Sequence, residues 1–190
     1  MLVQEKLFLL KDDTEVLLKS PKPQDAAAML EFLKQTSGET EFLIRYPEEV
    51  TFTLEDEKEI LDRYGASETD FMINAVCEGR IIGNIGVKQV GNSMKVRHRA
   101  MLGIAVLRAY WQLGLGRELL AQGIETARGI GYEQMELGVY ASNIVARSLY
   151  AQLGFEQTGV IPRAFRLKDG SYQDEVQMVL RLADVQEKIS

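Results

Sequence analysis

The sequence has one cysteine, Cys77, and one histidine, His98, among its 190 residues. A single cysteine excludes an intramolecular disulfide and a cysteine-rich zinc site. It suits a reducing compartment, so we expect a cytoplasmic location. One histidine leaves little scope for the common zinc and iron ligand sets, and we therefore expect no metal.

The chain also lacks an apolar run of the roughly 18 residues that a membrane-spanning helix needs. Its N-terminal stretch has no small-residue cleavage site, so we expect neither a membrane partner nor a signal peptide. Basic residues are in deficit, with 22 Lys and Arg against 28 Asp and Glu and a net charge of −6. Because nucleic acid phosphates attract basic surfaces, this balance argues against a nucleic-acid partner. An anionic ligand would have to be bound locally.

What the sequence does contain is typical of a globular protein, with 46% hydrophobic and 26% charged residues. The length predicts a single domain over residues 1–190, with a core at about 14–182. Apolar periodicity and turn residues predict strands and helices that alternate along the chain. The predicted strands are 14–19, 70–77, 80–89, 97–107, 133–140, 160–167 and 172–182. The predicted helices are 25–38, 54–64, one that starts at Leu115 and ends near Gly129 or Gly131, and 143–153.

The most informative stretch runs from Gly103 to Arg117, from a buried strand through a glycine-containing turn into a helix. The first backbone N–H groups of a helix have no intrahelical partner, and the helix dipole is positive there. Gly114 and Gly116 let a ligand approach this backbone closely, so a phosphate or pyrophosphate is the natural ligand. Arg117 and Arg108 can add charge-assisted hydrogen bonds.

Two common phosphate motifs do not fit this turn. The Walker pattern needs Gly-Lys-Ser/Thr, but Gly116 is followed by Arg117-Glu118. The dinucleotide fingerprint needs a third glycine where Leu119 stands. Taken alone, the glycine turn fits a plain connection as well as a phosphate site.

A second segment, Asn143 to Phe155, reads Asn-x-x-Ala-x-x-Leu-Tyr-x-x-x-Gly-Phe. Together the two segments resemble the GNAT superfamily of acyl-CoA-dependent N-acyltransferases, whose signature is Gln/Arg-x-x-Gly-x-Gly/Ala between a strand and a helix. The resemblance covers Thr14 to Leu182 and implies a three-layer α/β fold, with a mixed, mostly antiparallel sheet flanked by helices. Trp111 departs from the pattern because it stands at the Gln/Arg position, which weakens side-chain contact to the phosphate.

The resemblance implies transfer of an acetyl group from the cosubstrate acetyl-CoA to an amine acceptor. Backbone groups of Ile104 and Val106 would pair with the pantetheine arm, and the Val106 amide would donate to the oxyanion. Asn143 would contact the cofactor or cap its own helix. Tyr150 is expected, from its place in the motif, to protonate the leaving thiolate. The pyrophosphate would be held by the amides of Leu113, Gly114, Leu115, Gly116 and Arg117.

The general base is left open. Members of the family with a similar strand use a Glu at the position that here holds Gly138, so that assignment fails. Glu136 lies two residues earlier on the same face of the strand. His98 is a second candidate, because histidine exchanges protons near neutral pH. Tyr140 is a third, and an amine that arrives neutral would need no base.

Two other hypotheses stay open. In the first, the chain is not an enzyme but an acyl-CoA-binding sensor or regulatory module without catalysis. Gly138 favours this hypothesis and Tyr150 opposes it. A nucleotide-phosphate binder using the same helix start would instead prefer ATP or NAD to CoA. The sequence does not distinguish a small-molecule amine from a protein or peptide amine as acceptor. It also leaves the oligomeric state open, a homodimer included.

Overall fold

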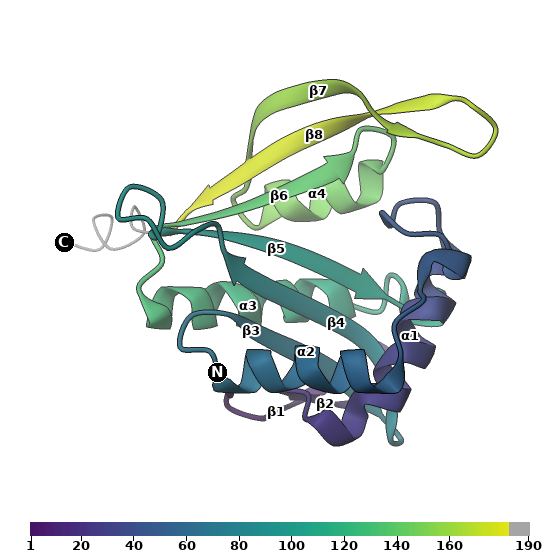
Figure 1. Cartoon of the computed structure of the whole chain (residues 1–190), viewed down its shortest axis with the longest axis vertical. Helices are drawn as coiled ribbons and strands as arrows, with labels where there is room; N and C mark the ends of the chain where they lie inside the picture. Colours follow the sequence, from purple (N-terminus) through teal and green to yellow (C-terminus); the bar gives the residue numbers. More distant parts are fainter. Residues whose placement is uncertain (183–190) are drawn as a thin grey trace. The chain divides into compact units, whose positions relative to one another are not determined.

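The computed structural model describes residues 1–182, which are drawn in colour in Figure 1. The chain divides into two compact units. One unit comprises Met1–Lys88 with Gly103–Thr126, and the other comprises Gln89–Leu102 with the described residues from Ala127 onward. Strands are hydrogen-bonded in the order β1-β2-β3-β4-β5-β6-β8-β7. The predicted fold class, a mixed and mostly antiparallel sheet with helices, is confirmed. The single-domain boundary stays a prediction.

The first unit forms around β4, whose alternating residues face different helices. A Cβ atom on Gly83 would lie 3.0 Å from Leu119 of α3, whereas one on Gly86 would lie 3.4 Å from the Tyr64 hydroxyl of α2. Successive strand residues point to opposite faces, so α3 covers one face and α2 the other (Figure 1). The elements of this unit are β1 (Lys6–Leu9), β2 (Glu15–Lys19), α1 (Ala26–Glu39), α2 (Leu54–Ala66), β3 (Phe71–Cys77), β4 (Arg80–Gln89), the second half of β5 (Arg99–Val106) and most of α3 (Leu115–Ile130).

The second unit is built on an antiparallel pair that runs the full length of β6. Leu137 and Val139 of β6 are buried together with Val176 and Met178 of β8, which form the apolar face. The opposite face of the pair contains Glu136, Gly138 and Glu175, which are exposed or half-buried. The elements are the first half of β5, β6 (Gln134–Tyr140), α4 (Ile144–Gln152), β7 (Glu156–Arg166) and β8 (Tyr172–Arg181).

Some predicted boundaries are wrong. The first two predicted helices stop at 38 and 64, but α1 and α2 continue to Glu39 and Ala66, so Gly38 and Gly65 both lie inside helices. Neither glycine has the left-handed backbone of a helix terminator. Helix α2 ends at Ala66, and the N–H of the next residue, Ser67, donates to the Arg63 carbonyl. Asp25, the first residue of the predicted helix, lies at the N-cap of α1, and its carboxylate accepts from the Lys22 N–H at 2.8 Å and not from a helix N–H.

Three strand predictions also need correction. Strand β5 begins at Arg99 and not at Arg97, because the Arg97 N–H bonds to the Ser93 carbonyl within a turn. Strand β7 begins at Glu156, since its pairing with β8 already starts there. Strand β1 was not predicted at all. Its place depends on antiparallel pairing with β2, as in Leu7 opposite Leu17.

Candidate active site

The connection from β5 to α3 forms the helix start that the sequence predicts. After a 3-10 turn at Arg108–Tyr110, the chain passes through Gln112 and Gly114, whose left-handed φ values are 63° and 96°. The first bond of α3 is from the Glu118 N–H to the Gly114 carbonyl, at 3.1 Å. The N–H groups of Leu115 and Gly116 precede this bond, so they have no intrahelical acceptor. A compact anion is the ligand that such a backbone binds best.

Three hydrogen bonds hold this loop in place. The Lys11 N–H donates to the Leu113 carbonyl at 3.1 Å, which ties the loop to the turn after β1. The Arg108 N–H donates to Glu39 Oε2 at 2.6 Å, at the end of α1. The Trp111 indole N–H folds back and donates to the Val106 carbonyl at 2.7 Å. The loop is therefore preorganised.

Charge near the helix start is also balanced. Glu118 lies in the first turn of α3, where its carboxylate would repel a phosphate. Lys6 of β1 places its Nζ 2.6 Å from Glu118 Oε1, and this hydrogen bond raises the pKa of Lys6. The Arg108 guanidinium lies 5.4 Å from the centre of the Trp111 ring. Sequence reasoning missed Lys6 and Glu39, because neither is near the loop in sequence.

An open hollow of about 420 Å³ lies beside the loop. Arg108 and Trp111 line it on one side and the end of α1 with the residues after it on the other. The lining residues are Gly38, Glu39, Thr40, Glu41, Phe42, Arg108 and Trp111. This hollow gives a ligand at the loop room to extend.

The backbone of β5 beyond its first residues is not used in pairing with β6. That parallel register covers Arg99–Met101 only, opposite Gln134–Glu136. Ile104 and Val106 lie beyond it, where their backbone can pair with an extended ligand arm. The Val106 carbonyl already accepts from Trp111, which leaves its amide as the group that can act on a ligand.

In the second unit, Asn143 and Tyr150 lie on the predicted helix α4. Asn143 caps it, with Oδ1 accepting from the Ala146 N–H at 3.2 Å. Tyr150 is 8% exposed, and its ring centre lies 5.9 Å from that of Phe155. Burial raises the pKa of Tyr150 to about 12. The phenol therefore stays protonated at neutral pH, as a proton donor must.

Glu136 is held in an ion pair. Arg99 binds both carboxylate oxygens, with Nη2 2.7 Å from Oε2 and Nε on Oε1. Gln134 Nε2 also donates to Oε1 at 2.8 Å. The hydrogen bond from Arg99 lowers the pKa of Glu136, since both contacts favour the charged form. His98 lies just before β5, and its carbonyl accepts from the Glu133 N–H at 3.0 Å.

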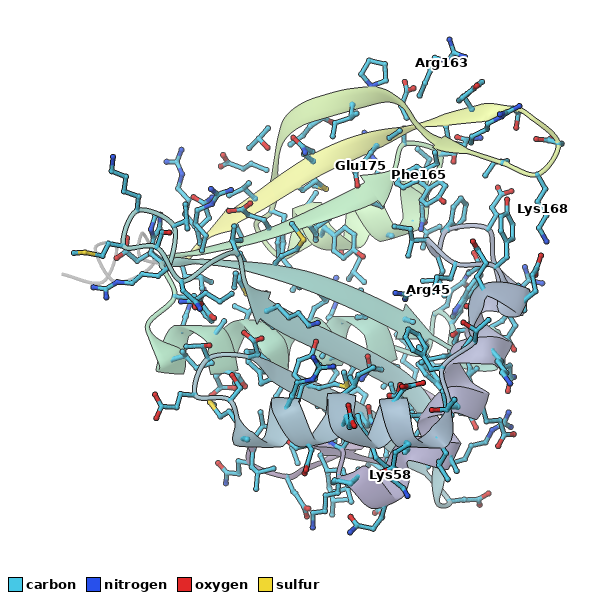
Figure 2. All side chains as sticks on the ribbon, viewed as in Figure 1. Arg45, Lys58, Arg163, Phe165, Lys168 and Glu175 are labelled. Atoms are coloured by element: carbon cyan, nitrogen blue, oxygen red, sulfur yellow. The ribbon has the colours of Figure 1, made fainter. Side chains whose placement is uncertain are left out.

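A carboxylate that the sequence did not reveal lies over Gly138. A Cβ atom built on Gly138 would be 2.6 Å from Cδ of Glu175, so the Glu175 side chain occupies that place. Beside it, the rings of Tyr140 and Phe165 are stacked with centres 3.9 Å apart. Figure 2 shows Glu175 and Phe165 on the hairpin of β7 and β8. No local pattern marks Glu175, because its place depends on the register of two distant strands.

Within residues 1–182, no helix is long and apolar enough to cross a membrane. In the same part of the chain, no three His, Cys, Asp or Glu side chains are grouped as metal ligands.

A model of the acetyltransferase (GNAT) family matches residues 30–155. A solved GNAT-family acetyltransferase from Streptococcus pneumoniae is 29% identical, with 87% of this chain and 99% of that chain covered and a TM-score of 0.84. The yncA structure from Salmonella typhimurium, which contains its cofactor acetyl-CoA, is 23% identical with coverages of 89% and 95% and a TM-score of 0.74. A ribosomal-protein-alanine N-acetyltransferase from Brucella melitensis is 24% identical, with coverages of 87% and 99% and a TM-score of 0.76. No curated protein matches the chain.

The family match includes both the glycine turn before α3 and the helix of Asn143 and Tyr150. It also covers well over half of the residues. The chain belongs to the GNAT acetyltransferase family.

Proposed function

We propose that this protein transfers an acetyl group from acetyl-CoA directly to a primary amine. The observation that carries the proposal is the start of α3 directly after β5, with Gly114 in a left-handed conformation and the loop held by Glu39 and Lys11. Such a rigid helix start suits a pyrophosphate, the anionic part of CoA. Family membership and the acetyl-CoA of the yncA structure support the choice of donor.

The donor site is proposed on the loop and on β5. Amides of residues 113–117 hold the pyrophosphate, and the backbone of Ile104 and Val106 pairs with the pantetheine arm as an added strand would. Bound acetyl-CoA supplies the activated thioester. Lys6 supports this site by neutralising Glu118.

The protein's groups then supply hydrogen bonds and protons. The Val106 amide donates to the oxyanion that develops on the attacked carbonyl. Tyr150 protonates the leaving thiolate, and Asn143 holds the first turn of α4. Glu136 positions Arg99 and is not the base, because the Arg99 guanidinium already binds its carboxylate. His98 stays a candidate base. No acyl-enzyme is required, so Cys77, which is buried, has no role as nucleophile.

Thermal unfolding with acetyl-CoA tests the donor site, with ATP and NAD as controls. A ligand that binds only the folded state at about a hundredfold its Kd adds roughly 2.7 kcal/mol, or several degrees in Tm. Gly116→Asp, which places a negative charge at the helix start, should abolish the shift. Gly129→Asp, far along the same helix, should keep it. Equal shifts with ATP or NAD would instead support a general phosphate binder.

Release of CoA thiol in the presence of amines tests catalysis. Turnover with an amine supports the transferase. Binding of acetyl-CoA without turnover on small amines or peptide N-termini would support the sensor hypothesis instead.

A further inference from the structure

We propose that Glu175 of β8 is the general base that removes a proton from the acceptor amine. This assignment rests on the acetyl transfer proposed above and adds a residue that the motifs do not contain. An alkylammonium group has no lone pair, so an amine must lose a proton before it can attack a thioester.

The position of Glu175 follows from the pairing of β6 with β8. Tyr140 lies opposite Glu175 and Gly138 lies opposite Gln177. Directly opposed residues share one face of the sheet, so Glu175 is on the face of Gly138 and Glu136. A Cβ on Gly138 would lie 2.6 Å from Cδ and 3.2 Å from Cγ of Glu175. The carboxylate therefore lies across Gly138, and only glycine at position 138 leaves it this room.

The carboxylate of Glu175 also differs from that of Glu136 in its surroundings. Glu136 is bound by Arg99 and Gln134, which lowers its affinity for a proton. Glu175 makes no hydrogen bond or ion pair through its carboxylate within residues 1–182. Its side chain is half-buried and its oxygens remain available to a substrate.

An aromatic wall flanks this carboxylate. Tyr140, directly opposite Glu175, stacks on Phe165 with an interplanar angle of 8°. A carboxylate beside aromatic rings is a favourable place for an alkylammonium ion, because both attract a cation. In Figure 2, Glu175 and Phe165 are neighbours on the hairpin. The same group thus binds the protonated amine and deprotonates it.

The proton balance of the step is complete. The ammonium gives one proton to Glu175, which passes it to solvent. The freed lone pair forms the C–N bond, and the C–S bond breaks when the tetrahedral species collapses. The thiolate takes the hydroxyl proton of Tyr150, and the second proton of the nitrogen returns to Tyr150 through water. The products are an acetamide, CoA thiol and one proton.

Four single variants and one double variant test this assignment. Glu175→Gln keeps the shape of the side chain and removes its basicity. Gly138→Ala keeps every ionisable group but displaces the Glu175 carboxylate. Glu156→Gln, an exposed carboxylate of β7, and Gly159→Ala, whose Cβ would approach only Gln177 at 3.4 Å, are the matched controls. Tm with and without acetyl-CoA shows that each variant is folded and binds the donor.

The rate of CoA thiol release is measured with acetyl-CoA and butylamine, tyramine, alaninamide or methoxyamine. Butylamine and tyramine are ammonium ions at neutral pH, whereas methoxyamine is a much weaker base that is largely neutral and needs no base to remove a proton before it attacks. With the ammonium probes, Glu175→Gln and Gly138→Ala should each lower kcat/KM about 100-fold or more, the size of general base catalysis. With methoxyamine these two variants should change kcat/KM only a few-fold, and the controls should match the wild type with every amine.

A double variant, Gly138→Glu with Glu175→Gly, returns a carboxylate to the same place from the other strand and should restore activity at least in part. If the wild type turns over and Glu175→Gln has the same kcat/KM, the role of Glu175 is overturned, while the proposed acetyl transfer is unaffected. An equal loss of kcat/KM with methoxyamine and with butylamine also overturns the role of Glu175, because methoxyamine needs no base. Donor binding without wild-type turnover on any probe contradicts the transferase proposal, and the role of Glu175 falls with it.

Discussion

The packing of α3 against β4 can be tested by adding one methyl group at Gly83. In Gly83→Ala the new Cβ would lie 3.0 Å from Leu119 Cδ1 and 3.2 Å from Leu115 Cδ2. Carbon atoms prefer a separation of about 3.5–4.0 Å, so both leucines must move. Both are 0% exposed, so neither side chain can move without displacing other packed atoms. Because Leu115 is the first residue of α3, its displacement moves the proposed phosphate site.

The free-energy cost of this overpacking is best obtained by comparing Gly83→Ala with a matched control variant. Gly103→Ala in β5 adds the same methyl group where no atom lies within 4 Å. Both substitutions raise the free energy of unfolding by about 0.5–1 kcal/mol, because alanine loses less backbone entropy on folding than glycine does. Only Gly83→Ala incurs the overpacking cost of about 1–3 kcal/mol. The difference between the variants is therefore about 1–3 kcal/mol, or several degrees in Tm for a chain of this length.

Circular dichroism melts of the two variants, with and without saturating acetyl-CoA, measure both effects. Gly83→Ala should melt several degrees below Gly103→Ala and show a smaller rise with acetyl-CoA. Equal melting temperatures would refute the tight packing of α3 on β4. A lower Tm together with a full rise in Tm on adding acetyl-CoA would show that the position of Leu115 does not affect binding at the donor site.

Substitutions at three further positions have defined outcomes. Tyr150→Phe should lower kcat at neutral pH and leave acetyl-CoA affinity unchanged; normal turnover would remove Tyr150 from the mechanism. Burial raises the pKa of Tyr150 from 10.0 to about 12, so the unfolded state loses this proton first and wild-type stability should fall between these pH values more steeply than that of Tyr150→Phe. Asn143→Ala should cost about 1 kcal/mol in denaturant unfolding by removing the bond to Ala146, and Asn143→Asp should cost less. The hydrogen bond from Arg99 lowers the pKa of Glu136, so this pair stabilises the fold above the ordinary carboxyl pKa and is lost in acid. Glu136→Gln should therefore reduce the acid sensitivity of unfolding, by about 0.5–1 kcal/mol for a partly exposed pair; an identical pH profile would argue against the pair.

Features that depend on residues close in sequence could be predicted. Leu115 and Leu119 show the spacing of a helix face, and the helix begins at Leu115 as expected. Asn143 caps α4 because its side chain reaches an N–H only three residues away. Gly154, which follows the helix, has a φ of 94°, as a helix terminator should.

Features that depend on distant residues could not be predicted. Glu175 lies over Gly138 only because β6 and β8 pair in one particular register, which sequence spacing does not determine. The pairing of Glu136 with Arg99 arises in the same way, from the short parallel register of β5 and β6. Lys6 meets Glu118 only once β1 has joined the sheet.

The central claim is direct acetyl transfer from acetyl-CoA to an amine. It is tested most directly by measuring, in one reaction, the CoA thiol released and the acetylated amine formed, with mass spectrometry of the protein alongside. We predict one acetylated amine for each CoA released and no acetyl group on the protein. Thiol release without acetylated amine, or an acetyl group that accumulates on Cys77, would contradict the account.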